Sequence, residues 1–373
     1  MAHTIGRSLR SLRPRCDQQV HSMDGNDSPD SDPILSFDRH VSSLLLSLAD
    51  ADAGSFLSVP WISKLLRSFL LLLDDFNDLL LLLLPRANLP NCPLLKRLLS
   101  DFFDRSVKAL DLLNAVRDGL DRVRLWSGHL DIVVPAVADR KLRRARKSLG
   151  DLSLLLGETD PALLLPNHHH HNRSFGRDPN RRGGLRTLSW SVSRSWSAAR
   201  QLQAMGSGLS PPRPADVSGT AGLAVPVFTM GSVLLFVSWA LVAAIPCQDR
   251  GLQHAHHLPV PRSFPWAAAM ASLQEKVLEE QKRRERDRRS HSASGLMREV
   301  CVIEKGTRRL IELLDGTGGE GEEVKERVRE LDEVREGLKE GLEGLERQVR
   351  EVFHRIVRSR TEGLDCLSRS SRQ

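Results

Sequence analysis

The pattern of apolar and polar positions singles out one segment, Leu223–Ile245, which contains no charged residue. A helix rises ~1.5 Å per residue, so this segment would reach roughly 34 Å, enough to cross a hydrocarbon core of about 30 Å. Its apolar character is carried by the side chains of Leu223, Val233, Leu234, Leu235, Phe236, Trp239 and Ile245. The pattern predicts a helix that either spans a membrane or is buried as the central helix of a helical protein.

A second leucine-rich segment, Trp61–Leu84, does not qualify as a membrane span. Four of its charged side chains, Arg67, Asp74, Asp75 and Asp78, would have to enter the bilayer. Each costs about 2.5–3.5 kcal/mol near the bilayer centre, which outweighs the roughly −4 to −8 kcal/mol that the leucines and phenylalanines contribute. We expect an amphipathic helix here, and at most one membrane-crossing segment in the chain.

Apolar residues at helical spacing recur elsewhere in the chain. Leu94–Trp126 carries one such stripe, and a short one covers Leu296–Leu314. The strongest periodicity is in Val324–Ile356, where nine of ten consecutive a and d positions are apolar and Arg335 is the exception. Because the Gly-rich stretch Asp315–Glu322 joins the last two stripes, they predict an antiparallel helical hairpin.

These patterns predict an all-α fold of long, mostly antiparallel helices that form a bundle. The last stripe is longer than the one before it, so part of it is expected to meet either the N-terminal helices or another protein. The expected partner-helix residues are Leu338, Leu342, Leu345 and Val349. Composition divides the chain into a disordered N-terminus (1–33), an N-terminal helical region (34–156), a low-complexity linker (157–184), a Ser/Trp segment with the apolar helix (185–250), a Pro-rich connection with a charged basic helix (251–290) and a C-terminal helical hairpin (291–373).

Charge and composition narrow the class of partner. The formal net charge is +7, which favours anionic surfaces. The chain has no Tyr and few aromatic residues, which argues against a nucleic-acid platform built on base stacking. Two basic clusters stand out, Lys141–Lys147 and Lys282–Arg289. We expect the second to bind an anionic membrane surface through Lys282, Arg283, Arg284, Arg286, Arg288 and Arg289; the alternatives are a solvated helix face and a nuclear-import cluster.

Candidate chemistry is sparse. Asp74, Asp75 and Asp78 could form a carboxylate cluster, but a solvated helix face explains them better. The tract His168–His171 lacks nearby carboxylates or cysteines, and the five scattered cysteines form no metal-binding spacing. Cys247 follows the apolar segment and could be acylated or simply inert. Without a nucleotide-binding loop or a nucleophile elbow, the sequence predicts no enzyme, cofactor, metal or small-molecule substrate.

Five stretches resemble the plant BYPASS-related family. They are FDRHVSSLL (Phe37–Leu45), SDFFDRSVKALDLLNAVRDGL (Ser100–Leu120), RTLSWSVSRSWSAARQLQ (Arg186–Gln203), LAVPVFTMGSVLLFVSWALVAAIPCQDRGLQ (Leu223–Gln253) and LERQVREVFHRIVRSRTEGLD (Leu345–Asp365). The resemblance implies a plant protein without known enzymatic activity. Some relatives are described as partners of the membrane-tethering subunit of the exocyst, and others as developmental regulators.

The residues and the resemblance together predict a non-enzymatic, membrane-associated interaction protein, facing the cytosol as a single-pass or peripheral protein. It would modulate exocytosis or development through contact with an exocyst subunit. The alternative is a soluble nuclear or cytosolic developmental regulator, in which Lys282–Arg289 serves for import.

Overall fold

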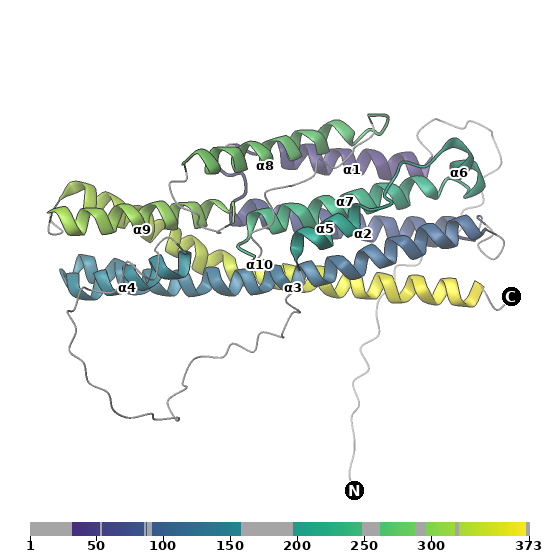
Figure 1. Cartoon of the computed structure of the whole chain (residues 1–373). Coiled ribbons are helices and arrows are strands. Elements are labelled where there is room, and N and C mark those ends of the chain that lie inside the picture. The colour runs from purple at the N-terminus through teal and green to yellow at the C-terminus, as the bar shows by residue number, and fades with distance from the viewer. Residues whose placement is uncertain are drawn as a thin grey trace, which may run out of the picture. The chain divides into compact units, whose positions relative to one another are not determined.

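The computed structural model describes residues 32–52, 54–85, 87, 92–157, 197–247, 262–287, 295–317 and 321–370. These residues form ten α-helices and no strand, which confirms the predicted all-α fold (Figure 1). The helices are α1 (Pro33–Ala49), α2 (Val59–Leu83), α3 (Pro93–Ala138), α4 (Leu142–Leu156), α5 (Ala198–Gly206), α6 (Pro214–Gly219), α7 (Ala224–Ala244), α8 (Ala267–Asp287), α9 (Arg298–Thr317) and α10 (Glu322–Ser370).

Some predicted features lie outside the described residues. They are most of the N-terminus predicted to be disordered, the linker after Gly157 with the tract His168–His171, and the last two arginines of the second basic cluster, Arg288 and Arg289. The division of the chain into six parts stays a prediction.

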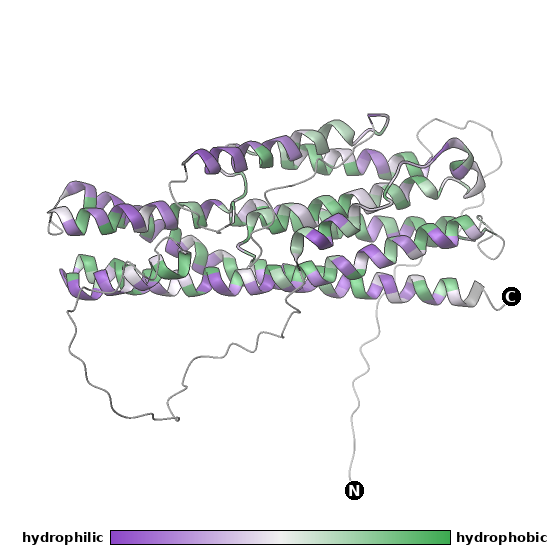
Figure 2. Ribbon diagram, in the orientation of Figure 1, coloured by the Kyte–Doolittle hydropathy of each residue, from purple (hydrophilic) through white to green (hydrophobic). Residues whose placement is uncertain are grey.

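The two longest helices, α3 and α10, lie side by side and run antiparallel (Figure 1). Lys339 of α10 pairs with Asp131 of α3 at 3.0 Å, and Glu346, further along α10, pairs with Arg124, which is earlier in α3. Both helices bury apolar side chains in the bundle, and Figure 2 shows hydrophobic and hydrophilic residues alternating along each ribbon.

Helix α2 packs along α10 in the parallel direction. Val59, at its start, lies against Gly341, and Asn77, near its end, accepts a 2.7 Å hydrogen bond from the hydroxyl of Ser359. Its N-terminus is defined locally, because the hydroxyl of Ser58 caps the backbone N–H of Trp61 and a proline occupies the first turn. The charged residues that exclude this segment as a membrane span thus lie on a helix packed into the bundle.

Helix α7 is enclosed by the rest of the protein. All of its residues except Val225 are buried, and α1, α2, α3, α5 and α6 pack against it. Gly119 of α3 makes room for its end, since a Cβ at that position would approach the side chain of Ile245 to 2.6 Å. The segment without a polar face is therefore the centre of the described structure.

The C-terminal carbonyls of α7 are satisfied by a segment that comes later in the chain. The backbone N–H groups of Leu296 and Met297 donate to the carbonyls of Ala243 and Ala244, each at 2.8 Å. Gly295 allows this close approach, because any Cβ there would collide with the Ala244 carbonyl. A helix end buried without such partners would leave several carbonyls unpaired.

The residues that follow Met297, at the start of α9, are hydrogen-bonded to the start of α2. The backbone N–H of Val59 donates to Oε1 of Glu299 at 3.0 Å, and the N–H of Arg298 donates to the carbonyl of Leu57. The second carboxylate oxygen of Glu299 is buried with no hydrogen-bond partner in the described part of the chain. Burial raises the pKa of Glu299 because a buried charge loses its hydration.

We predict a pH-dependent penalty from Glu299. With its pKa raised above the ordinary value of 4.5, the folded state binds the proton more tightly than the unfolded state. The free energy of unfolding therefore falls as the pH rises from this value through the folded-state pKa. Glu299→Gln keeps the oxygen that accepts from Val59 and removes the charge. Urea unfolding should show the variant more stable than the wild type at about pH 7, with the advantage shrinking towards about pH 4; a pH-independent difference would contradict this.

Two glycines of α10 are expected to respond to alanine in opposite directions. A Cβ at Gly341 would lie 2.7 Å from Cγ1 of the buried Val59, whereas a Cβ at Gly344 would meet nothing within 4 Å. Gly344→Ala should stabilise the protein by about 1 kcal/mol, because alanine loses less backbone entropy in a helix. Gly341→Ala should destabilise it by about 1–3 kcal/mol through overpacking. Thermal unfolding followed by circular dichroism measures both, and equal shifts would refute the packing of α2 on α10.

Candidate functional site

The apolar segment contains seven residues singled out by the sequence, and in this structure all of them are at most 5 % exposed. Within the described part of the chain, α7 is the one helix long and apolar enough to cross a membrane. Its apolar side chains contact other helices of the same chain instead of facing outward. Of the two forms that the sequence allows, the structure shows the enclosed one.

A short chain of buried polar groups holds α7 in place. The indole N–H of Trp266 donates to the hydroxyl of Thr229 at 3.2 Å, and that hydroxyl donates to Oδ1 of Asp38 at 2.9 Å. All three side chains are buried, and they link α7 to α1 and to the turn before α8. Because α7 has no amphipathic face, these hydrogen bonds fix which of its sides meets α1.

The second basic cluster does not form a single exposed face. Arg284 is buried and makes an ion pair with Glu304 of α9; it also donates to the carbonyl of Gly295. Arg283 is exposed and pairs with Glu280 of its own helix at 2.7 Å. Lys282 and Arg286 are exposed. The structure therefore separates Arg284 from the residues expected to bind an anionic surface, and the role of the others stays a prediction.

The spacing of residues along α8 is itself a sequence signal for the burial of Arg284. The buried face of α8 carries Met270, Leu273 and Val277, and Arg284 follows Val277 by seven residues, which returns to the same face. A charged residue on an apolar stripe calls for a buried partner, which Glu304 supplies.

Cys301 lies beside this ion pair and is not an activated thiol. Arg284 donates to its sulfur, yet burial dominates and raises the pKa of Cys301 to about 11. Because the thiolate is the reactive form, this cysteine is protonated and unreactive at neutral pH. Cys247, after α7, is also buried.

The predicted partner-helix residues of α10 are inside the bundle. Leu338, Leu342, Leu345 and Val349 are at most 5 % exposed, and α10 packs on α2, α3 and α9. A partner could reach these side chains only if α10 separated from those helices. Their role in partner binding stays a prediction.

The carboxylates of α2 are used as links between helices. Asp74 makes an ion pair with Arg355 of α10, and Oδ2 of Asp75 lies 2.5 Å from Nδ1 of His40 on α1. Across the described ranges, no three His, Cys, Asp or Glu side chains are grouped as metal ligands. Asp74 and Asp75 therefore point to two different parts of the helix packing, and Asp78 is exposed.

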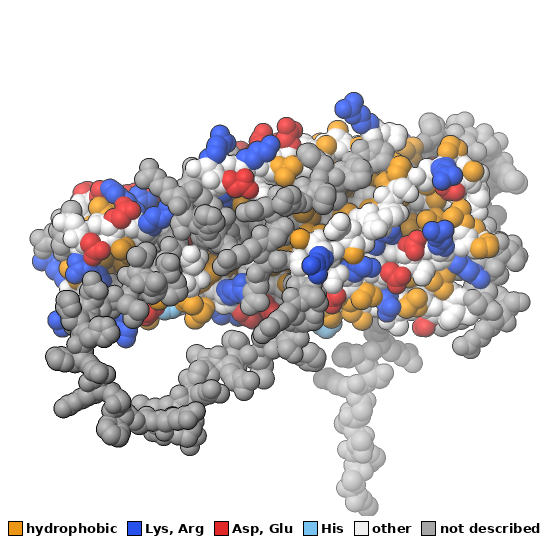
Figure 3. All heavy atoms as spheres, in the orientation of Figure 1, with side chains coloured by type: hydrophobic (Ala, Val, Ile, Leu, Met, Phe, Trp, Pro, Cys, Tyr) orange, Lys and Arg blue, Asp and Glu red, His pale blue; other side chains and the backbone are white. Residues whose placement is uncertain are grey.

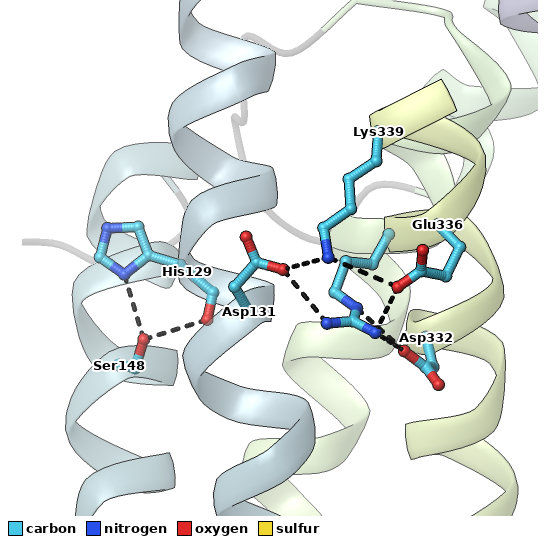
Figure 4. Close-up of polar contacts among 7 residues, drawn as sticks. His129, Asp131, Ser148, Asp332, Glu336 and Lys339 are labelled. Carbon is cyan, nitrogen blue, oxygen red and sulfur yellow. Dashed lines mark hydrogen bonds and ion pairs between the residues drawn. The ribbon is translucent and has the colours of Figure 1, made fainter. Parts of the chain in front are cut away.

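Figure 4 shows the polar contacts between α3, α4 and α10. The carboxylate of Asp131 accepts a hydrogen bond from Arg335 at 3.2 Å and lies 3.0 Å from the ammonium group of Lys339. The hydrogen bond between Asp131 and Lys339 raises the pKa of Lys339. On the other side of α3, the Ser148 hydroxyl of α4 donates to the carbonyl of His129, and its oxygen lies 3.1 Å from the imidazole Nδ1. The contacts of Asp131 join α3 to α10, and those of His129 join α3 to α4, so the two sets do not form one site.

A shallow groove of about 520 Å³ lies on α3 near these contacts, lined by Asp121, Arg124, Leu125, Gly128, His129 and Ile132. All of these residues come from one helix, and the arginine is engaged by Glu346 of α10. Its lining contains one imidazole, His129, and one carboxylate, Asp121.

A family model described as Protein ROH1-like matches residues 2–367 of the chain. The chain belongs to the ROH1-like family. It is 43 % identical to Protein ROH1D of Arabidopsis thaliana, over 98 % of this chain and 97 % of the relative. It is 35 % identical to Protein ROH1A of the same plant, over 86 % and 83 % of the two chains. The BYPASS-related resemblance is thus confirmed, and no solved structure matches.

We predict that replacing only one residue of the Arg284–Glu304 ion pair strongly destabilises the fold. Arg284→Ala would remove the guanidinium that pairs with the buried Glu304 carboxylate, and should lower the free energy of unfolding by about 3–5 kcal/mol. Lys282→Ala, on the exposed side of the same helix, should change it by no more than about 0.5 kcal/mol. The double variant Arg284→Met/Glu304→Leu should recover most of the loss. Urea unfolding of the three variants decides the matter, and equal small effects would show that Arg284 is solvated.

Proposed function

We propose that this ROH1-like protein is a non-enzymatic interaction protein that associates peripherally with the cytosolic face of plant membranes. In this proposal it modulates exocytosis through contact with the membrane-tethering subunit of the exocyst. The exocyst link is supported by the BYPASS-related resemblance, and the non-enzymatic role by that resemblance together with the lack of catalytic motifs in the sequence.

The observation that carries the peripheral part is the enclosure of α7 by its own chain. Insertion of this helix would gain roughly 4–7 kcal/mol from its Leu, Val, Ile and Phe residues. It would also expose apolar side chains that now pack on it, such as Phe264 and Trp266 against Phe228. Each large side chain returned to water costs about 1.5–3 kcal/mol, so three or four would cancel the gain.

The buried polar groups add to the same balance. If Thr229 left the interior, Asp38 would lose a hydrogen-bond donor and the indole N–H of Trp266 would lose its acceptor. An unsatisfied buried polar group costs about 1–3 kcal/mol, and more if it is charged. The enclosed state of α7 is therefore the stable one in water, which favours contact with the membrane through the outer surface.

The alternative of a nuclear regulator is less well supported. It relies on Lys282–Arg289 as an exposed import cluster, and within that cluster Arg284 is buried against Glu304. An import receptor reads extended, accessible basic residues, whereas this part of the cluster is helical and partly internal.

We predict that the full-length protein in plant membranes is released by an alkaline carbonate wash, while a single-pass membrane protein in the same sample stays in the pellet. The reason is that α7 has no lipid-facing side while it remains enclosed. Leu235→Asp should reduce the folded, soluble fraction instead of releasing a folded protein, because it would bury an unpaired charge. Retention in the pellet after the carbonate wash would contradict peripheral association.

The exocyst part is tested separately with purified components. The full chain, prepared without detergent, should form a complex with the membrane-tethering subunit in size-exclusion chromatography. Failure to form the complex would refute the exocyst contact and leave peripheral association standing.

A further inference from the structure

The outer face of α4 combines basic and apolar side chains in an unusual way. The N-terminal half of the helix and its cap carry five basic residues, and the C-terminal half ends in three leucines. Arg143, Lys147 and Leu154 share one side by their spacing of four and seven residues, and Arg144 and Leu155 lie next to them. All five are exposed, with Leu154 at 41 % and Leu155 at 44 %.

The opposite side of α4 holds the helix firmly on the bundle. Leu149 and Leu152 are fully buried, and Ser148 bonds to His129 of α3. Arg146 donates to the carbonyl of Leu314 at the end of α9 and lies close to Asp315. The outer face is thus presented on a fixed helix, between α3 and α9.

One carboxylate shares this face, because the exposed Asp151 follows Lys147 by four residues, so the three cations leave the face with a formal net charge of +2 (three minus one). Within the described part of the chain, Arg143, Arg144 and Lys147 make no ion pair or side-chain hydrogen bond. On α10, by contrast, many arginines form an ion pair with a carboxylate three or four residues away, as Arg329 does with Glu326. Figure 3 shows basic side chains gathered at the edge of the molecule where α4 lies.

We infer that the outer face of α4, formed by Arg143, Arg144, Lys147, Leu154 and Leu155, docks on the surface of an anionic lipid bilayer. This rests on the proposed peripheral association and assigns it to a surface. Lysine and arginine side chains near such a surface are attracted to acidic headgroups, and the attraction weakens beyond a Debye length of about 8 Å. The two leucines, at the same level of the helix face, would enter the boundary between headgroups and acyl chains.

The leucines favour a bilayer over a nucleic acid. A duplex would contact the cations through its phosphates but would leave Leu154 and Leu155 in water. A bilayer interface satisfies both kinds of side chain, because amphipathic helices place basic residues at the headgroups and leucines below them. The first basic cluster, rather than the partly buried second one, then supplies the contact.

The test uses the full-length protein and vesicles of phosphatidylcholine with or without phosphatidylserine. The wild type should bind the acidic vesicles, and binding should weaken as salt is raised. The triple variant Arg143→Gln/Arg144→Gln/Lys147→Gln should lower the partition coefficient on the order of 100-fold, since each cation contributes a several-fold factor. Leu154→Ser/Leu155→Ser should lower it by roughly tenfold without changing the salt dependence.

The matched control is Lys282→Gln/Arg283→Gln/Arg286→Gln on α8, which removes the same charge from exposed positions. It should bind the vesicles nearly as well as the wild type. Circular dichroism and melting temperature should be unchanged in all three variants, because none of the substituted side chains is buried.

Three results would overturn the inference. If the α8 control loses binding and the α4 variant does not, docking occurs elsewhere and peripheral association still stands. If the wild type binds neither vesicle, both this inference and the proposed peripheral association fail. If it binds duplex DNA more tightly than acidic vesicles at the same salt concentration, the face recognises a nucleic acid instead.

Discussion

A helix without a polar side must be covered on every side, and this constraint determines the arrangement of the whole bundle. Helix α7 offers no face that could be left in water, so amphipathic helices surround it and turn their charged sides outward (Figure 2). The long pair α3 and α10 extends the core beyond the reach of α7, and α2 joins both parts. In the described part of the chain, most charged side chains consequently lie on the outer faces of these helices.

Buried polar contacts supply the specificity that an all-apolar centre lacks. Leucine and valine side chains pack acceptably in several rotations of a helix, but Thr229 reaches Asp38 and Trp266 in only one. Arg284 and Glu304 do the same for α8 and α9. Such pairs add little net stability compared with apolar residues of similar size, while a partner left alone is strongly unfavourable. They therefore select one packing among many of similar energy.

Hydrophobic periodicity was sufficient to predict the helical class, the limits of α7 within a residue or two, and the stripes of α9 and α10. It was not sufficient to decide between lipid and protein as the surroundings of α7, because both present an apolar environment. Nor does it locate Arg284, whose burial depends on a carboxylate from another helix, or distinguish Gly341 from Gly344, which differ only in what lies across from them. Helix α3 continues for one turn beyond Pro135, a residue usually expected to end a helix because it lacks the N–H for an i→i−4 hydrogen bond.

The position of α7 in the chain has a consequence for biosynthesis. Helices α1, α2, α3, α5 and α6, which pack against it, all precede it in the sequence. A ribosome adds about 5–20 residues per second, so most of the covering helices leave the exit tunnel seconds before the apolar helix does. The nascent chain can therefore enclose this helix as it emerges, before a targeting factor that scans for hydrophobic segments has long access to it. The last carbonyls of α7 can form their hydrogen bonds only after Leu296 and Met297 have been synthesised, so its C-terminal turn is the last part of the helix to be stabilised.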